Sequence, residues 1–174
     1  MTRSTAPTMH PCEPVGLAYT ATARFRFSNS VDIPATPEQL FEIFLDADAW
    51  PRWAGVITKV VWTSDPPHGV GTTRTVHMLG GLVGDEEFLA WETGRHMAFR
   101  FTACSLRAVR AFAEAYDIEP TDRGCRLTWT LALHGNAPTN LSLTVVRPVM
   151  NLLFRRFLRT LAALAAERYA GRAG

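Results

Sequence analysis

Between residues 55 and 134 the chain is a succession of short apolar segments divided by turn sequences, and no other feature of the sequence constrains the fold as strongly. The turn sequences are rich in glycine, proline and aspartate and are short enough for hairpins: Asp65–Gly69, Gly80–Gly84, Thr93–Gly94 and Asp122–Gly124. They separate six predicted strands, at 55–64, 70–78, 85–92, 95–103, 107–119 and 124–134. Because a parallel connection needs a dozen or more residues, we predict an antiparallel meander.

Further elements flank the meander on both sides. Residues 19–33 alternate apolar and polar side chains, which predicts one more half-buried strand. Thr36 is then placed to cap a helix that begins at Pro37, and residues 46–53 predict a second short helix or a tight turn. The chain ends in an Ala- and Leu-rich segment that predicts a long helix over about residues 148–170.

These elements predict an α+β fold in which a seven-stranded curved antiparallel sheet wraps around the long C-terminal helix, with two short helices after the first strand. The C-terminal helix has this place because it is the only predicted element long enough to cover one face of the sheet. A chain of 174 residues suffices for one domain, which we expect over residues 19–171. Residues 1–18 contain three prolines and no periodicity, so they predict a mobile tail.

Composition narrows the class of protein. No apolar run approaches the roughly 20 residues that cross a bilayer, and the first residues lack the apolar core of a signal peptide. The net charge of +2 argues against a nucleic-acid-binding protein. Three scattered cysteines, Cys12, Cys104 and Cys125, indicate free thiols, so we expect a cytoplasmic protein. The five histidines show no metal-ligand spacing, so we expect no metal site.

Positive charge is concentrated at the C-terminus. Residues 141–174 contain a single acidic residue, Glu167, and the six arginines 147, 155, 156, 159, 168 and 172. One interpretation is an ordinary solvated helix exterior. The alternative is weak peripheral contact with an anionic membrane through Arg155, Arg156 and Arg159.

Several short segments are informative beyond their secondary structure: Val31–Glu38, Asp46 with Trp50–Trp53, Gly69–Thr72 with Arg74, Trp91–Arg95, and Gly124 with Leu127–Trp129. In this order of elements they resemble the START-like helix-grip superfamily, most closely its polyketide cyclase/dehydrase and lipid-transport branch. The resemblance covers about residues 20–170. It implies a mostly apolar cavity between the sheet and the C-terminal helix. We expect no cofactor.

Alternate side chains of a strand share a face, so parity predicts which residues line that cavity. The apolar walls are predicted to be Phe99, Phe101, Phe112 and Trp129 from the strands and Phe157 from the helix. The same parity turns four polar residues inward, namely Arg74, Arg110, Glu114 and Tyr116. In segment 85–92 both parities contain large apolar residues, so neither face can be assigned.

The inward polar residues have two interpretations. The first is structural: an Arg110–Glu114 ion pair, or strand ends that reach solvent. The second is the polar end of a ligand site, where an arginine holds a carboxylate or polarises a carbonyl group and Glu114 or Tyr116 transfers protons.

Two functions therefore stay open, and both require a hydrophobic small-molecule ligand. In one, the protein is a cofactor-free cyclase or dehydratase of polyketide-like substrates. Glu114 and Tyr116 are then the candidate acid or base, and Arg74 or Arg110 stabilises the enolate. In the other, it carries or senses a lipid without catalysis and touches anionic membranes through the basic helix. Monomer and homodimer fit both functions.

Overall fold

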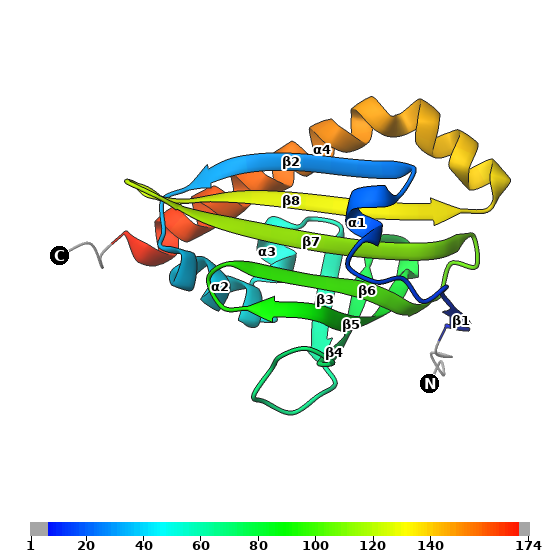
Figure 1. Ribbon diagram of the computed structural model, residues 1–174, viewed down its shortest axis with the longest axis horizontal. Coiled ribbons are helices and arrows are strands. Elements are labelled where there is room, and N and C mark those ends of the chain that lie inside the picture. The colour runs from blue at the N-terminus through cyan, green and yellow to red at the C-terminus, as the bar shows by residue number, and fades with distance from the viewer. Residues whose placement is uncertain (1–6, 171–174) are drawn as a thin grey trace, which may run out of the picture.

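The computed structural model describes residues 7–170, and a single curved antiparallel sheet forms its centre (Figure 1). Seven strands follow the order β2–β8–β7–β6–β5–β4–β3, so the first long strand pairs with the last and extends the meander. Their bounds are β2 Phe25–Ile33, β3 Ile57–Trp62, β4 Thr73–Met78, β5 Val83–Glu92, β6 His96–Cys104, β7 Val109–Thr121 and β8 Gly124–Gly135. The predicted seven-stranded antiparallel sheet is confirmed.

Two short helices, α2 (Pro37–Leu45) and α3 (Trp50–Trp53), follow β2 as predicted. The hydroxyl of Thr36 accepts a hydrogen bond from the amide of Gln39, whose side chain accepts one from the Thr36 amide. This capping box fixes where α2 begins. The helix then buries one apolar face, formed by Leu40, Phe41, Ile43 and Phe44.

The C-terminal helix α4 (Ala137–Tyr169) runs along the concave side of the sheet, and its C-terminal half supplies most of its core contacts (Figure 1). Its buried side chains include Phe154, Phe157, Leu158, Leu161, Leu164 and Ala165. The predicted start near residue 148 is wrong, because the helix begins eleven residues earlier behind an Asn136 cap and continues through Pro148. Val149, in the first turn of the predicted helix, is 67% exposed and does not pack on the sheet.

The N-terminal segment lies against the sheet. Strand β1 (His10–Pro11) pairs with the end of β6, and helix α1 (Tyr19–Thr22) packs near β7 and β8. The amide of Glu13 donates to the carbonyl of Arg110 at 2.7 Å. The expectation of a mobile tail over residues 1–18 is therefore wrong for this docked part, whereas residues 1–6, and residue 171 at the other end of the expected domain, lie outside the described residues.

One close approach of backbone to side chain explains a glycine in β5. A Cβ atom at Gly84 would lie 2.6 Å from the nearest ring atom of Phe101 on the neighbouring strand β6. Since no side chain fits there without displacing the ring, the glycine leaves room for the tip of the Phe101 ring beside the β5 backbone.

Candidate functional site

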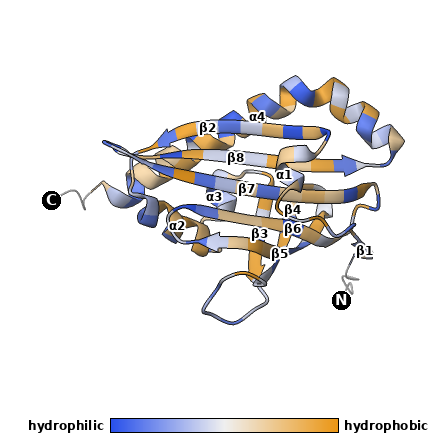
Figure 2. Cartoon of the chain, in the orientation of Figure 1, coloured by the Kyte–Doolittle hydropathy of each residue, from blue (hydrophilic) through white to orange (hydrophobic). Residues whose placement is uncertain are grey.

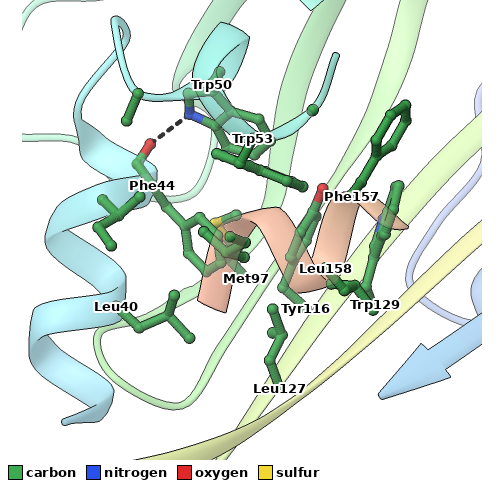
Figure 3. Packing of buried hydrophobic residues seen from close by; sticks show 14 of the residues in the cluster. Leu40, Phe44, Trp50, Trp53, Met97, Tyr116, Leu127, Trp129, Phe157 and Leu158 are labelled. Carbon is green, nitrogen blue, oxygen red and sulfur yellow. Dashed lines mark hydrogen bonds between the residues drawn. The ribbon is translucent and has the colours of Figure 1, made fainter. Parts of the chain in front are cut away.

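A cavity of about 280 Å³ lies between the concave face of the sheet and α4. Most of its lining is aromatic or aliphatic: Trp50, Trp53, Ala54, Val56, Ile57, Val76, Met78, Phe99, Phe101, Phe112, Trp129, Leu131, Met150, Leu153, Phe154 and Phe157. Figure 3 shows the side chains of Trp53, Tyr116, Trp129 and Phe157 converging from α3, the sheet and α4. The volume is just below the roughly 300–1,000 Å³ of typical small-molecule sites, and it suits a compact apolar ligand.

Larger hollows lie on the outside of the protein, one beside Asp32 and Arg126 and one beside Arg26 and Arg147. Both are lined mainly by polar residues, and neither includes the aromatic residues that surround the internal cavity. The internal cavity is therefore the candidate ligand site.

The first polar feature of the cavity is an ion pair between Arg74 in β4 and Glu86 in β5. The two residues are cross-strand partners, and Nε of Arg74 donates to Oε2 of Glu86 at 2.5 Å. Their side chains are 1% and 4% exposed, and burial raises the pKa of Glu86 while Arg74 opposes that rise.

The guanidinium group of Arg74 also lies between aromatic rings. Its central carbon is 4.1 Å from the ring centroid of Trp50 and 4.6 Å from that of Phe99, so both rings stabilise the cation. The indole of Trp50 is held in this place by a 2.9 Å hydrogen bond to the carbonyl of Phe44 (Figure 3). Nη1 of Arg74 is buried and has no hydrogen-bond partner in residues 7–170, so one donor of the pair is unused.

The second polar feature is the carboxyl group of Glu114 in β7. Its Oε2 accepts two hydrogen bonds, from the hydroxyl of Tyr116 at 2.5 Å and from the indole of Trp129 at 3.0 Å. Burial raises the pKa of Glu114 to about 8 in spite of these bonds, and burial next to Glu114 raises the pKa of Tyr116 well above its usual value. Glu114 therefore changes protonation near neutral pH.

A shallow groove marks the mouth of the cavity. It shares Trp53, Val56, Leu153 and Phe157 with the cavity lining and extends outward to Leu79, Arg156 and Thr160. Leu153 is 38% exposed although it lines the cavity, so its side chain lies at the boundary between the cavity and solvent.

All but one of the predicted cavity residues lie where parity places them. Those that line the cavity are Arg74, Phe99, Phe101, Phe112, Glu114, Tyr116, Trp129 and Phe157. The prediction for Arg110 is wrong, because its side chain is exposed and its Nε lies 3.7 Å from Glu13. A β-bulge between Val109 and Ala111 breaks the alternation of β7 at this point. Arg110 thus neither pairs with Glu114 nor faces a ligand.

Three residues that shape the polar part of the site were not predicted from the sequence. Glu86 lies in the segment 85–92, in which neither face could be assigned from the sequence. A hairpin centred on Gly80 predicts it opposite Arg74, and that signal could have identified it. Trp50 and Trp53 were assigned to a short helix without a role. Trp53 lines the cavity, and its indole nitrogen is buried without a hydrogen-bond partner in the described residues.

Residues 7–170 contain no cluster of three or more His, Cys, Asp and Glu side chains arranged to hold a metal ion. No helix among them is both long and apolar enough to span a membrane. The three cysteines are free thiols, as predicted, and burial raises the pKa of Cys12 and Cys125 to about 11, which disfavours the nucleophilic thiolate.

Fold and cavity together define a helix-grip protein with an internal site for a hydrophobic ligand. Over residues 24–166 the sequence matches the family described as polyketide cyclase/dehydrase and lipid transport, and the chain belongs to this family. The resemblance noted in the sequence is thereby confirmed.

Two comparisons set the chain among its relatives. Uncharacterised proteins of Mycobacterium tuberculosis and Mycobacterium bovis are 57% identical to it over 162 residues, which cover 93% of this chain and 97% of each relative. Among solved structures, the Zhui aromatase/cyclase of a Streptomyces species aligns with a TM-score of 0.63 and 15% identity, covering 86% of this chain and 98% of that one. The di-domain aromatase/cyclase StfQ of the steffimycin pathway aligns with a TM-score of 0.65 and 14% identity, covering 83% of this chain and 52% of that one. At these identities the structural likeness establishes the fold alone.

Proposed function

We propose that this protein binds a polyketide-like small molecule in its internal cavity and catalyses a cofactor-independent cyclisation or dehydration of it. One observation carries the proposal: Glu114, a buried carboxyl group with a pKa of about 8, shares a mostly apolar cavity with Arg74, whose Nη1 has no hydrogen-bond partner in the described residues. A proton-transfer group with a pKa near the working pH and a hydrogen-bond donor for the enolate oxygen are the two groups that enolate chemistry needs.

Glu114 and Arg74 can supply every proton transfer and the enolate stabilisation that the proposed reaction needs. In a β-hydroxy ketone, the Glu114 carboxylate removes the proton next to the carbonyl, and the developing enolate oxygen is stabilised by Arg74. The same proton then passes from Glu114 to the departing hydroxyl, which leaves as water while the C–O bond breaks and a carbon–carbon double bond forms. Tyr116 holds Glu114 in place through its 2.5 Å hydrogen bond, so we assign it a positioning role.

Ligand binding in the cavity can be tested at its mouth. Replacing Leu153 by Trp is expected to weaken binding of 2-acetylnaphthalene by about 5- to 150-fold, because overfilling a packed space costs about 1–3 kcal/mol. Leu152→Trp is the matched control, since Leu152 is the adjacent residue, is 67% exposed and does not line the cavity. Titration calorimetry measures both affinities. Equal affinities in the two variants would contradict binding in this cavity.

A specific observation favours a second candidate function, that of a lipid carrier that touches membranes. Large apolar side chains are exposed along one half of α4, at Leu141, Val145, Val149 and Leu152, and hydrophobic colouring recurs there in Figure 2. Val149 and Leu152 share a groove with Leu153, Arg156 and Arg159, beside the mouth of the cavity. Such an exposed apolar surface edged by cations has the chemistry of a site for an anionic bilayer.

Hydrogen bonding in the protein supports a different choice of arginines for the proposed contact. Nε of Arg155 donates to the side chain of Asn29 at 3.1 Å, so Arg155 is engaged with β2. Arg156 and Arg159 are exposed and have no carboxylate partner within residues 7–170. They are the arginines that remain available to lipid headgroups.

We expect Arg156→Gln with Arg159→Gln to weaken binding to phosphatidylglycerol-containing vesicles about thirtyfold, at about 1 kcal/mol for each cation. The charge-matched control replaces Arg107 and Arg123, which are exposed in turns between strands. Co-sedimentation at low and high salt measures the binding. If vesicles are not bound at low salt, or if both double variants bind alike, the carrier function loses its support. Absence of vesicle binding together with self-association of the free protein would instead identify the apolar surface as an interface between two copies of the chain.

A further inference from the structure

We propose that the cavity selects ligands whose buried end is an uncharged carbonyl group, held by Nη1 of Arg74, and that it rejects the corresponding carboxylates. The inference rests on the proposed function only in requiring that a small molecule enters this cavity. It excludes free fatty acids and other apolar acids as the preferred ligands.

The first step of the argument is the unused donor. Arg74 is 1% exposed and uses Nε to bind Glu86, whereas its Nη1 is buried without a partner in the described residues. A buried donor without a partner loses its hydrogen bond to water and gains nothing in return. Since Arg74 lines the cavity, a ligand acceptor is the group that can complete its hydrogen bonding.

The second step is the charge balance. The positive charge of Arg74 is already neutralised by Glu86 at 2.5 Å, with both side chains buried. A ligand carboxylate beside Arg74 would be a second anion with no second cation, because the remaining titratable residues of the lining are Glu114 and Tyr116. An uncompensated buried charge is strongly unfavourable, whereas a carbonyl oxygen accepts the same hydrogen bond without adding charge.

The third step is that two further polar groups of the cavity, on Trp53 and Glu114, are donors. The indole N–H of Trp53 is buried without a partner in the described part of the chain. Oε2 of Glu114 accepts two hydrogen bonds, so in the neutral acid the proton is carried by Oε1. With a pKa of about 8, this acid is mostly neutral at pH 7. Arg74 in β4, Glu114 in β7 and Trp53 in α3 therefore all offer hydrogen-bond donors, which favours a ligand that carries acceptors.

Three probes of nearly equal size test the inference: 2-acetylnaphthalene, 2-ethylnaphthalene and 2-naphthoate. Calorimetry at pH 7 on the full chain is expected to show the acetyl compound binding about tenfold or more tightly than the ethyl compound, as for a hydrogen bond to a charged group. The naphthoate should bind more weakly than either. Equal affinity for the acetyl and ethyl compounds, or tightest binding of naphthoate, would overturn the inference and leave binding in the cavity intact. If none of the three probes binds, the proposed function itself fails.

A double variant assigns the preference to Arg74. Arg74→Met with Glu86→Leu replaces the buried ion pair by apolar side chains of similar volume, an exchange that is often neutral or stabilising. We expect it to bind the acetyl and ethyl compounds equally while the affinity for the ethyl compound stays within about threefold of wild type. A tenfold acetyl preference that persists in the double variant would show that Arg74 does not hold the carbonyl. The three-probe comparison in the wild-type protein decides the selectivity even if this variant does not fold.

Discussion

Replacing Glu114 by Gln is expected to reduce the dehydration of 4-hydroxy-4-phenylbutan-2-one by about 10²–10⁴-fold, which is the usual contribution of a general acid–base group. The amide oxygen of Gln still accepts the hydrogen bonds of Tyr116 and Trp129, so the site is retained, but the amide neither takes up nor releases a proton. Affinity for 2-acetylnaphthalene should change by less than about threefold, since only proton transfer is lost. The near-ultraviolet absorbance of the conjugated enone product reports the rate.

The wild-type protein should show a rate that rises with pH up to about 8 and then levels, because the active base is the ionised form of Glu114. Glu87→Gln is the matched control, since Glu87 is the residue after Glu86, pairs with Arg100 and does not line the cavity. Turnover by Glu114→Gln within about threefold of wild type would remove Glu114 from the mechanism. A wild-type protein that binds this compound without converting it would favour the carrier function.

A second readout of Glu114→Gln needs no substrate. Burial raises the pKa of Glu114 from its ordinary 4.5 to about 8, so between these values the folded protein binds more protons than the unfolded chain. The free energy of unfolding of the wild-type protein should therefore contain a contribution that falls as pH rises from about 5 to about 8. In the Gln variant that contribution should be absent from urea unfolding curves.

Replacing Glu86 by Leu alone is expected to lower the free energy of unfolding by about 3–5 kcal/mol, because it leaves Arg74 as an uncompensated buried charge. Glu87→Leu breaks the neighbouring ion pair between Glu87, which is 33% exposed, and Arg100, which is 23% exposed. It should lower the free energy of unfolding by at most about 1 kcal/mol. Urea denaturation measures both losses.

The second half of this experiment adds Arg74→Met to Glu86→Leu. Removing the orphaned cation should restore most of the lost stability, so the two substitutions should be strongly non-additive. If the stability losses of Arg74→Met and Glu86→Leu add up in the double variant, or if Glu86→Leu is as stable as Glu87→Leu, then Arg74 and Glu86 do not act as a coupled buried ion pair.

Sequence periodicity predicted the fold and most of the cavity wherever the strands are regular. In β6 and β8, alternation places Phe99, Phe101 and Trp129 on the concave face, as the structure has them. It failed in β7 at Arg110 because a bulge inserts an extra residue there. Strand β5 could not be assigned for a different reason: Phe88 stands on one parity and Leu89 and Trp91 on the other, so large apolar residues mark neither face.

What alternation could not supply is pairing between distant segments. The role of Glu86 depends on its position opposite Arg74 in the neighbouring strand. The role of Trp50 depends on helix α3 placing its ring over the same guanidinium group. The early start of α4 was missed because the residues between 137 and 147 are mostly exposed, so they lack the apolar stripe that marks a helix packed on a sheet. Local sequence patterns therefore predicted the apolar residues that line the cavity, whereas the contacts of its polar residues could be identified only from the three-dimensional structure.

The contact of Gly84 with Phe101 has a consequence for how this family can diversify. Gly84 does not line the cavity, yet it sets the position of a ring that does. Natural variation or directed evolution at this one position would reshape the space open to the ligand without exchanging any residue that touches it. A survey of substrate preference across relatives, or a library meant to alter it, therefore has reason to include the layer behind the cavity wall as well as the wall itself.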